Sequence, residues 1–462
     1  MKYLMVFCLC VHIILTGAFV LSFGAVCTDT EFYILVILII LAFLRTGYIL
    51  YGFILLLPFT GNNAGNDYIP LLTIAGLFCG FRSIPYFFDN FRKIIKNRVN
   101  LFFLLFMAAG IIRSLRISGI ESIFNRYFIT ILYFPARILS AQENSLLYPL
   151  SFLMLFYISV HIFIYINKMI QEHRIKSFIL HFLIFSNLLA VAGLLKYYYH
   201  INIPLFFEST YSYMNIPRLS GFFANPGWYG QFLLFLIFPS LYFAISSKKR
   251  YMRIVFAFFS LISLISLALT LARAAYFSIL MLFLMSIAYL VYRFTKSWKF
   301  SMRLSFVTAL ILILIFSGLY LIKTDIRSHI ADNPRLHLYR FALNIFYENP
   351  VIGCGIGSFP QNARRHFTED TPMIVKYYHS TAHNTYLHLL SEGGILMLAL
   401  FAGLILMHIF RPAQDYFQIA VMISILALIF LALFQYIFYI NLIGIWFFIY
   451  LSITANYSDN YA

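Results

Sequence analysis

Residues 252–271 read MRIVFAFFSLISLISLALTL, and after Ala272 and Arg273 residues 274–293 read AAYFSILMLFLMSIAYLVYR. Each stretch holds about 20 mostly apolar residues, the length of α-helix that crosses about 30 Å of hydrocarbon. Only helices and closed barrels satisfy their backbone in lipid, and neither stretch shows the alternation of a barrel strand. The sequence therefore predicts two membrane-spanning helices joined by a minimal hairpin.

Similar apolar runs recur along the chain. Its 462 residues are 62% hydrophobic and 11% charged, whereas soluble proteins carry about 25% charged residues. Further spans are predicted at 99–118, 147–167, 175–199, 220–245, 304–323, 384–410, 415–433 and 436–455. The first 67 residues add about two or three crossings, because Arg45 interrupts one run. We interpret Tyr3–Val26 as a span, since it is longer than a signal-peptide core. The fold class is an all-α, polytopic bundle of about 12 to 14 spans.

The formal net charge of +17 is concentrated in short clusters between spans. These clusters lie at residues 92–98, 168–176, 248–253 and 293–303. Basic loops face the cytoplasm, so the charge indicates membrane topology and not nucleic-acid binding. An even number of spans between clusters then exposes the intervening loops on the opposite side, at residues 119–146, 200–219, 272–273 and 324–382.

The external stretch 324–382 is the one sizeable polar segment. Apolar residues such as Leu336, Leu338 and Ile345 recur there at helical spacing, and a Pro- and Gly-rich loop follows at 349–360, here named the glycine loop. We expect a small helical cap on the membrane bundle. A glycine loop alone is only a weak indication of phosphate binding.

The first candidate for chemistry is Arg218, in the sequence Arg218-Leu-Ser-Gly-Phe-Phe-Ala-Asn225-Pro-Gly. Its guanidinium is a permanent cation with a planar fork of donors, and the glycines and Asn-Pro turn allow close approach of backbone to a ligand. The competing interpretation is an interfacial anchor. Arg273 needs a similar explanation, because a basic residue is disfavoured in an external hairpin, and anchoring and anion contact both remain open.

The cap adds Arg335 and Arg340, and spacing places Arg335 on one helix face with Tyr339. The next span begins after His383 and Asn384, and a histidine at an external helix N-terminus can accept a proton near neutral pH.

Glu392 lies about 13 Å further along the helix that begins after His383, and a carboxylate inside the membrane is a candidate for function. A hydrogen bond between helices is its alternative.

The external face thus gathers Arg218, Arg273, Arg335 and His383 without a carboxylate pair. Cations without paired acids suit a dianionic ligand such as a diphosphate better than acid-pair hydrolysis. The five cysteines form no CxxC pair or metal spacing and are interpreted as small buried hydrophobes. We therefore expect no metal and no cofactor.

Three ordered motifs resemble the O-antigen ligase and polymerase family. They are Arg218-x-x-Gly-Phe-Phe-x-Asn-Pro, then Arg335-Leu-x-Leu-Tyr-x-x-Ala-Leu with the glycine loop, then His383 with ten residues before Gly394. The resemblance covers residues 200–410, with the periplasmic loop 324–382 inside it, and leaves 1–199 and 411–462 as additional spans. Two positions depart from the family pattern: Ala272-Arg273-Ala274 replaces the frequent Ser-Arg-Gly, and Gly227 replaces the second Asn of Asn-Pro-Asn.

The resemblance implies a GT-C-like, multi-pass glycosyltransferase of the bacterial inner membrane, acting at the periplasmic face without a metal and with inversion. Its donor would be a glycan on undecaprenyl diphosphate, and its acceptor either lipid A core, in a ligase, or a lipid-linked glycan, in a polymerase. By the same resemblance, Arg218, Arg335 and His383 would be catalytic, whereas Arg273, Arg340, Asn225, Asn384 and Glu392 would contact substrate.

Both activities share these motifs, and the compact spacing from His383 to Gly394 favours ligase. A transporter or flippase of lipid-linked glycans is the alternative of a different class, although transporters surround a midplane cavity with their charges. A structural scaffold with solvated charges is the third interpretation.

Overall fold

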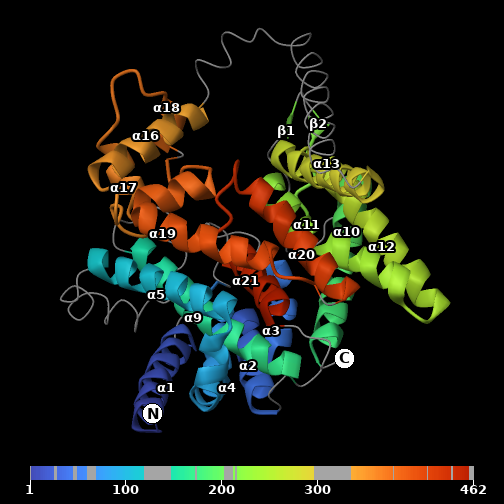
Figure 1. Ribbon diagram of the computed structural model, residues 1–462, viewed down its shortest axis with the longest axis horizontal. Helices are drawn as coiled ribbons and strands as arrows, with labels where there is room; N and C mark the ends of the chain where they lie inside the picture. The colour runs from blue at the N-terminus through green and yellow to red at the C-terminus, as the bar shows by residue number, and fades with distance from the viewer. Residues whose placement is uncertain are drawn as a thin grey trace.

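The computed structural model describes residues 2–24, 29–44, 49–59, 69–118, 147–171, 174–201, 212–213, 216–295, 334–377, 379–413, 415–438 and 441–456. Its described elements are helices apart from one two-residue antiparallel hairpin, which confirms the all-α class (Figure 1). In chain order they are α1 (Lys2–Gly24), α2 (Asp29–Leu44), α3 (Ile49–Leu55), η1 (Leu57–Phe59), α4 (Ile69–Lys96), α5 (Arg98–Ser118), α9 (Leu147–Gln171), α10 (Ile175–Tyr199), β1 (Ser212–Tyr213), β2 (Ile216–Pro217), α11 (Pro226–Ser246), α12 (Arg250–Leu269), α13 (Arg273–Thr295), α16 (Pro334–Glu348), α17 (Phe359–Arg364), α18 (Met373–Tyr377), α19 (Thr385–Ile409), α20 (Tyr416–Leu431) and α21 (Asn441–Asn456).

The centre of the bundle is α21, whose residues are almost all buried. It packs against α9 and α20, which in turn contact α4, α5, α11 and α13. Trp446 of α21 stacks on Phe182 of α10 with ring centroids 3.6 Å apart, and the Tyr450 hydroxyl donates to the Phe235 carbonyl of α11 at 2.8 Å. Large aromatic rings thus fill the axis of the bundle, where each buries a wide apolar area.

Five helices are long and apolar enough to cross a membrane, which supports a multi-pass membrane protein. They cover Phe152–Ile170, Ile175–Tyr199, Pro226–Ser246, Arg250–Leu269 and Thr385–Ile409. Each coincides with a predicted span, although α11 begins six residues after the predicted start at 220 because Pro226 opens it after a turn. The expected span 304–323 lies outside the described residues.

Elsewhere the described helices differ from the predicted spans. The expected span 99–118 is the second arm of a pair, α4 and α5, that bends by 115° at Asn97 and is either a broken span or a re-entrant loop. The helices α20 and α21 have 16 residues each, about 24 Å, and so are shorter than the expected spans 415–433 and 436–455. The described residues 432–438 that follow α20 bond to the start of α19, as described below.

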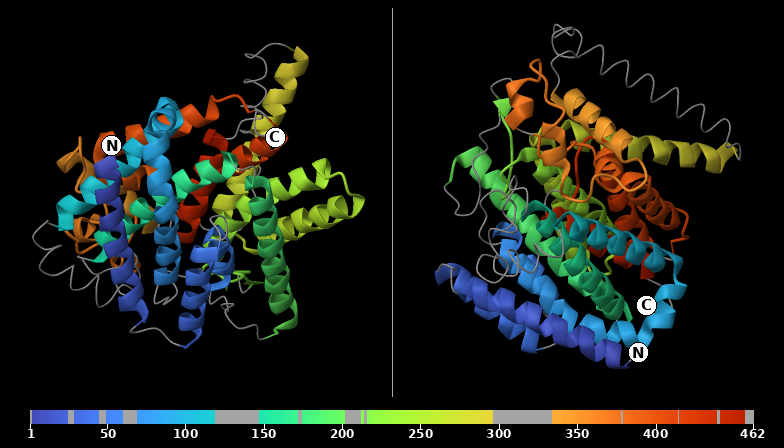
Figure 2. Two further views of the ribbon diagram at one scale, coloured as in Figure 1. Left: turned by 90° about the horizontal axis from the view of Figure 1, so that it is seen from below. Right: turned by 90° about the vertical axis from the view of Figure 1, so that its left-hand side faces the viewer.

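The expected cap is formed by α16, α17 and α18, which lie on α19 (Figure 1). Leu338, Phe341 and Ile345 of α16 turn inward and form a second hydrophobic cluster with Phe359 and Val375. The cap lies at the opposite end of the molecule from α1 (Figure 2).

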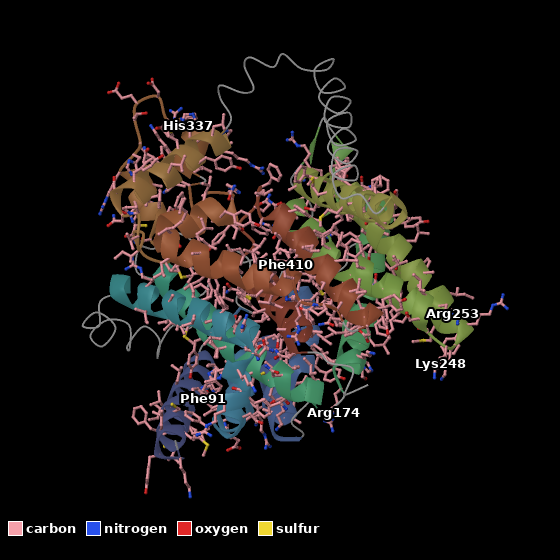
Figure 3. All side chains as sticks on the ribbon, in the orientation of Figure 1. Phe91, Arg174, Lys248, Arg253, His337 and Phe410 are labelled. Atoms are coloured by element: carbon pink, nitrogen blue, oxygen red, sulfur yellow. The ribbon has the colours of Figure 1, made fainter. Side chains whose placement is uncertain are left out.

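In Figure 3, His337 of the cap is likewise far from Arg174, Lys248 and Arg253, which belong to two of the basic clusters.

Candidate functional site

Arg218 lies between β2 and α11, and its guanidinium closes the C-terminal end of α12. Its Nε donates to the Thr270 carbonyl at 2.8 Å and its Nη2 to the Leu271 carbonyl at 3.3 Å. The carbonyls at a helix C-terminus lack intrahelical partners and favour a cation. Leu271 has a left-handed backbone (φ 48°), so Arg218 fixes the tight turn that leads into Arg273, the first residue of α13.

Arg335 lies in the first turn of α16 and within electrostatic range of Arg273. Burial lowers the pKa of the Arg335 guanidinium, the phenol of Tyr339 opposes that shift, and the charge of Arg273 adds to it. The shared face of Arg335 and Tyr339 is the one that their spacing predicted. Arg340, five positions further on, is exposed. Because the charges of Arg335 and Arg273 repel each other, this place favours an anion that can neutralise both.

His383 completes the group, immediately before α19. Burial lowers the pKa of its imidazole to about 4; Arg335 and His388 act in the same direction, and a hydrogen bond with the Gln435 side chain opposes them. No carboxylate is among the described groups that shift this pKa. The imidazole is therefore neutral near pH 7 and can accept a proton, and a bound anion would raise its pKa.

Gln435 comes from the turn between α20 and α21, which is bonded to the start of α19. The Thr385 hydroxyl donates to the Gln435 carbonyl at 2.7 Å and accepts from the Ile437 N–H at 3.1 Å, while the Thr385 N–H donates to the Ala432 carbonyl at 2.8 Å. Sequence reasoning missed Gln435, because it stands in a short connection without a motif.

Two tyrosines also accompany the cations and were not predicted as site residues. Tyr276 of α13 lies within electrostatic range of Arg218, and Tyr339 lies within range of Arg335. The available signal was helical spacing, since Tyr276 follows Arg273 by three residues and Tyr339 follows Arg335 by four. The Tyr276 hydroxyl donates to the Ala268 carbonyl, so its oxygen can only accept from a further partner.

Asn225 and Asn384 are helix N-caps beside this group. The Asn225 Oδ1 accepts from the Gly227 N–H at 2.7 Å at the start of α11. The Asn384 Oδ1 accepts from the Leu387 N–H at 3.0 Å, and its Nδ2 donates to the Leu433 carbonyl at 2.8 Å. Both side chains thus have identifiable structural partners, as expected of asparagine at an N-cap.

The glycine loop packs against a break in α19 at Gly394, whose backbone (φ 65°, ψ −168°) only glycine adopts readily. The Cys354 N–H donates to the Ser391 carbonyl at 3.0 Å, and the Gly355 N–H donates to the Glu392 carbonyl at 2.7 Å. These carbonyls would otherwise lack helical partners at the break.

Beyond the break the direction of donation reverses. The Ile395 and Leu396 N–H groups donate to the Pro350 and Val351 carbonyls at 2.9 and 3.2 Å. The loop therefore completes the hydrogen bonding of a broken helix. Its N–H groups at residues 354 and 355 serve that purpose and not a phosphate cradle.

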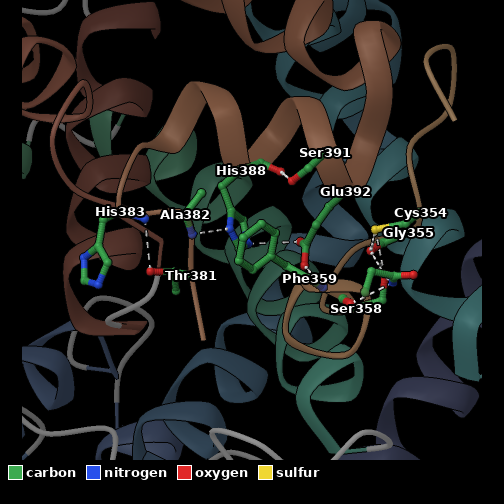
Figure 4. Close-up of polar contacts among 11 residues, drawn as sticks. Cys354, Gly355, Ser358, Phe359, Thr381, Ala382, His383, His388, Ser391 and Glu392 are labelled. Atoms are coloured by element: carbon green, nitrogen blue, oxygen red, sulfur yellow. Dashed lines mark hydrogen bonds and ion pairs between the residues drawn. The ribbon is translucent and has the colours of Figure 1, made fainter. Parts of the chain in front are cut away.

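Glu392 is fully buried beneath the cap, away from the cations. Its Oε1 accepts from the Phe359 N–H at 2.8 Å, and its Oε2 lies 3.3 Å from Nε2 of His388 (Figure 4). Nearby, burial and then the charge of Glu392 raise the pKa of the Cys354 thiol to about 12, which leaves it an inert neutral thiol.

Among the described residues, no three histidine, cysteine, aspartate or glutamate side chains gather in an arrangement that could hold a metal ion. The four predicted residues do form a chain of neighbours from four segments: Arg218 bonds to the turn that leads into Arg273, Arg273 acts on Arg335, and Arg335 acts on His383. Arg340 and Glu392 lie apart from them.

Comparison with known families places this group in context. Residues 258–402 match the O-antigen ligase family model, which confirms the resemblance over that stretch. The match includes Arg273, Arg335 and His383 and ends before the turn that carries Gln435; Arg218 precedes it. No curated protein matches the chain.

Proposed function

Since residues 258–402 match the O-antigen ligase family model, we propose that the chain is an inner-membrane glycosyltransferase that moves a glycan from undecaprenyl diphosphate to an acceptor during surface polysaccharide assembly. We favour lipid A core as the acceptor, which makes the protein a ligase. Transfer to a second lipid-linked glycan, the polymerase reaction, is the alternative that the experiment below separates.

The observation that carries this proposal is the convergence of cations around a neutral histidine. Arg273 acts electrostatically on Arg335, and Arg335 acts on His383. A diphosphate diester carries two negative charges close together, so it can neutralise two guanidinium groups at once. The fork geometry of arginine suits phosphate oxygens better than a lysine ammonium would.

The chemistry follows from these charges. The acceptor hydroxyl attacks the anomeric carbon from the face opposite the diphosphate, and its proton passes to the neutral imidazole of His383. The bond between the anomeric carbon and the phosphate oxygen breaks, and the leaving diphosphate gains negative charge. Arg335 and Arg218 stabilise that charge, with Arg273 in a supporting contact. None of these steps calls for a metal ion.

The proposed topology places this site at the periplasmic face, within a chain of about 12 to 14 spans. The separation of His337 from Arg174 and Lys248 in Figure 3 supports it, because basic loops face the cytoplasm. Asn225 and Asn384 then shape two helix N-termini beside the diphosphate, where N–H groups favour an anion.

The test is a deletion strain complemented with wild type, Arg218→Ala, Arg335→Ala or His383→Ala at equal membrane abundance. Surface polysaccharide is resolved on a gel, and carrier-linked glycan is extracted and measured. A ligase leaves bare lipid A core and long glycan on the carrier, whereas a polymerase leaves core with a single repeat. Full complementation by all three variants would overturn the assignment and favour a transporter or a scaffold.

A further inference from the structure

We propose that His388 and Glu392 form a positioning pair that fixes the backbone of the segment carrying His383. The pair acts through the N–H of Ala382 and does not touch substrate. This inference rests on the proposed function, because it assigns His383 a task that depends on exact placement.

Both side chains are fully buried, and the chemistry of the site leaves them without a role. The carboxylate is anchored on one side by the Phe359 N–H at 2.8 Å. Its other oxygen and Nε2 of His388 are 3.3 Å apart, without the alignment of a straight hydrogen bond, and have no other described partner. Burying a carboxylate costs free energy unless a polar group pairs with it. The short distance between the two atoms therefore indicates that His388 is that partner of Glu392.

The tautomer of His388 follows from its second contact. The Ala382 N–H donates to Nδ1 of His388 at 3.3 Å, so Nδ1 must be the acceptor. The ring proton then lies on Nε2, which faces Glu392. A carboxylate favours this tautomer because it accepts from an N–H and repels a lone pair. Glu392 thereby keeps Nδ1 available to Ala382.

The segment that receives this contact is strained. His383 has a left-handed backbone (φ 49°), which is unfavourable for a residue other than glycine. The N–H of His383 donates to the Thr381 hydroxyl at 3.3 Å, so the N–H groups of both Ala382 and His383 are held. Figure 4 shows the His383 ring directed away from the pair, which therefore acts on its backbone and not on its ring.

Packing holds the pair in place. The His388 ring lies against Tyr436 with centroids 3.9 Å apart and against Phe359 at 4.9 Å. Phe359 thus contacts both members, its ring with His388 and its N–H with Glu392. An apolar pair of similar volume would pack here without burying a charge, so stability alone does not explain the arrangement.

The test compares three single variants in detergent-purified full-length protein, with the undecaprenyl-diphosphate glycan extracted from the deletion strain as donor and core lipid from the same strain as acceptor. His388→Leu removes the acceptor for Ala382. His388→Asn retains one, because its Oδ1 occupies nearly the place of Nδ1. Glu392→Gln replaces one oxygen with an amide N–H. If that group faces His388, it disturbs the tautomer of the ring; if it faces Phe359, it breaks the bond that anchors the side chain.

We expect kcat to fall about 100-fold in His388→Leu with KM unchanged, since a displacement of about 1 Å costs that much and the arginines are untouched. His388→Asn should recover most of kcat. Glu392→Gln should lower kcat about 10-fold or more in the wild-type background but little in the His388→Asn background, where no tautomer is left to control. Thermal unfolding of each variant serves as the control for folding.

The outcomes separate the two claims. If wild type transfers glycan and His383→Ala does not, while His388→Leu retains full kcat, only the positioning pair is disproved. The pair is equally disproved if His388→Asn is as inactive as His388→Leu while both remain folded. If His388→Leu does not fold, the effect of Glu392→Gln in the two backgrounds decides alone. An inactive wild type, or an active His383→Ala, overturns the proposed function itself.

Discussion

The two ends of the first half of α19 contrast sharply in how they use polar residues. At the N-terminal end, Arg335 and His383 stand near Arg273 without a carboxylate among the described groups that shift the His383 pKa. At the break, Glu392 accepts from two N–H groups of the glycine loop, those of Gly355 at 2.7 Å and of Phe359 at 2.8 Å. The first region gathers positive charge, which suits an anionic ligand, whereas in the second the loop and the broken helix bond to each other.

This difference teaches that motif richness does not identify a ligand site. The glycine loop contains the chain's densest cluster of glycines, yet its left-handed residues at 353, 355 and 357 serve close packing on α19. The cation group has a plainer sequence but brings charges of one sign together. The clustered positive charges, and not the glycines, mark the place that suits a ligand.

Removing a cation should have the largest effect on activity. Arg335→Ala should lower kcat/KM about 10²–10³-fold, the usual loss when one preorganised donor to a developing charge is removed. Glycan transfer by purified protein gives the measurement. Arg365→Ala is the matched control, because Arg365 is an exposed arginine of the same cap, outside the group. Equal losses in both variants would mean that overall positive charge, and not this site, drives binding.

Closing the break in α19 should have the next largest effect, on stability. A Cβ at Gly394 would lie 2.4 Å from the carbonyl carbon and oxygen of Val351, in addition to the backbone strain. Gly394→Ala should therefore destabilise the protein by about 3 kcal/mol or more.

Thermal unfolding in detergent measures this effect. Gly17→Ala is its control, since a Cβ there meets no atom within 4 Å. A Gly394→Ala protein as stable as wild type would show that the loop and the helix separate easily, against the contrast drawn above.

Much of the fold was predictable because apolar length and basic clusters are local signals. The spans at 175–199 and 384–410 follow from the length of their apolar runs, and the helical cap follows from the helical spacing of its apolar residues. The bend at Asn97 and the shortness of α20 and α21 did not follow, because tertiary contacts determine where those helices end. The total of about 12 to 14 spans stays a prediction.

The candidate site was predictable in its residue types but not in its assembly. Charge and motif identify Arg218, Arg335 and His383 as candidates. The predicted topology places all three on the same external face. The bonds from Arg218 to the end of α12 and from Gln435 to His383 depend on long-range packing, which no spacing encodes. The roles of these residues in catalysis stay predictions until the variants are assayed.

The charge state of His383 provides a pH test of intermediate size. Its imidazole must be neutral to accept a proton, and its pKa lies at about 4 instead of 6.5. We expect kcat/KM to stay constant from pH 8 to about 5 and to fall at lower pH, because kcat/KM reports the free enzyme. Gln435→Leu should move the acid limb to still lower pH, since it removes the hydrogen bond that raises this pKa. An acid limb near pH 6.5 would contradict the buried, cation-flanked environment.

The smallest expected effect concerns Asn384, which sits at the boundary between the two regions. Asn384→Ser should cost little stability, because serine retains an N-cap acceptor for the Leu387 N–H and loses only the contact with Leu433. Asn384→Ala should cost about 1 kcal/mol of stability, and transfer by both variants should stay within about threefold of wild type.

Thermal unfolding and glycan transfer are measured on the same preparations of both variants. If Asn384→Ser keeps wild-type stability but loses activity more than tenfold, its amide contacts substrate. The ligand site would then extend onto α19 itself and include Asn384, although the structure already gives its side chain bonds to Leu387 and Leu433.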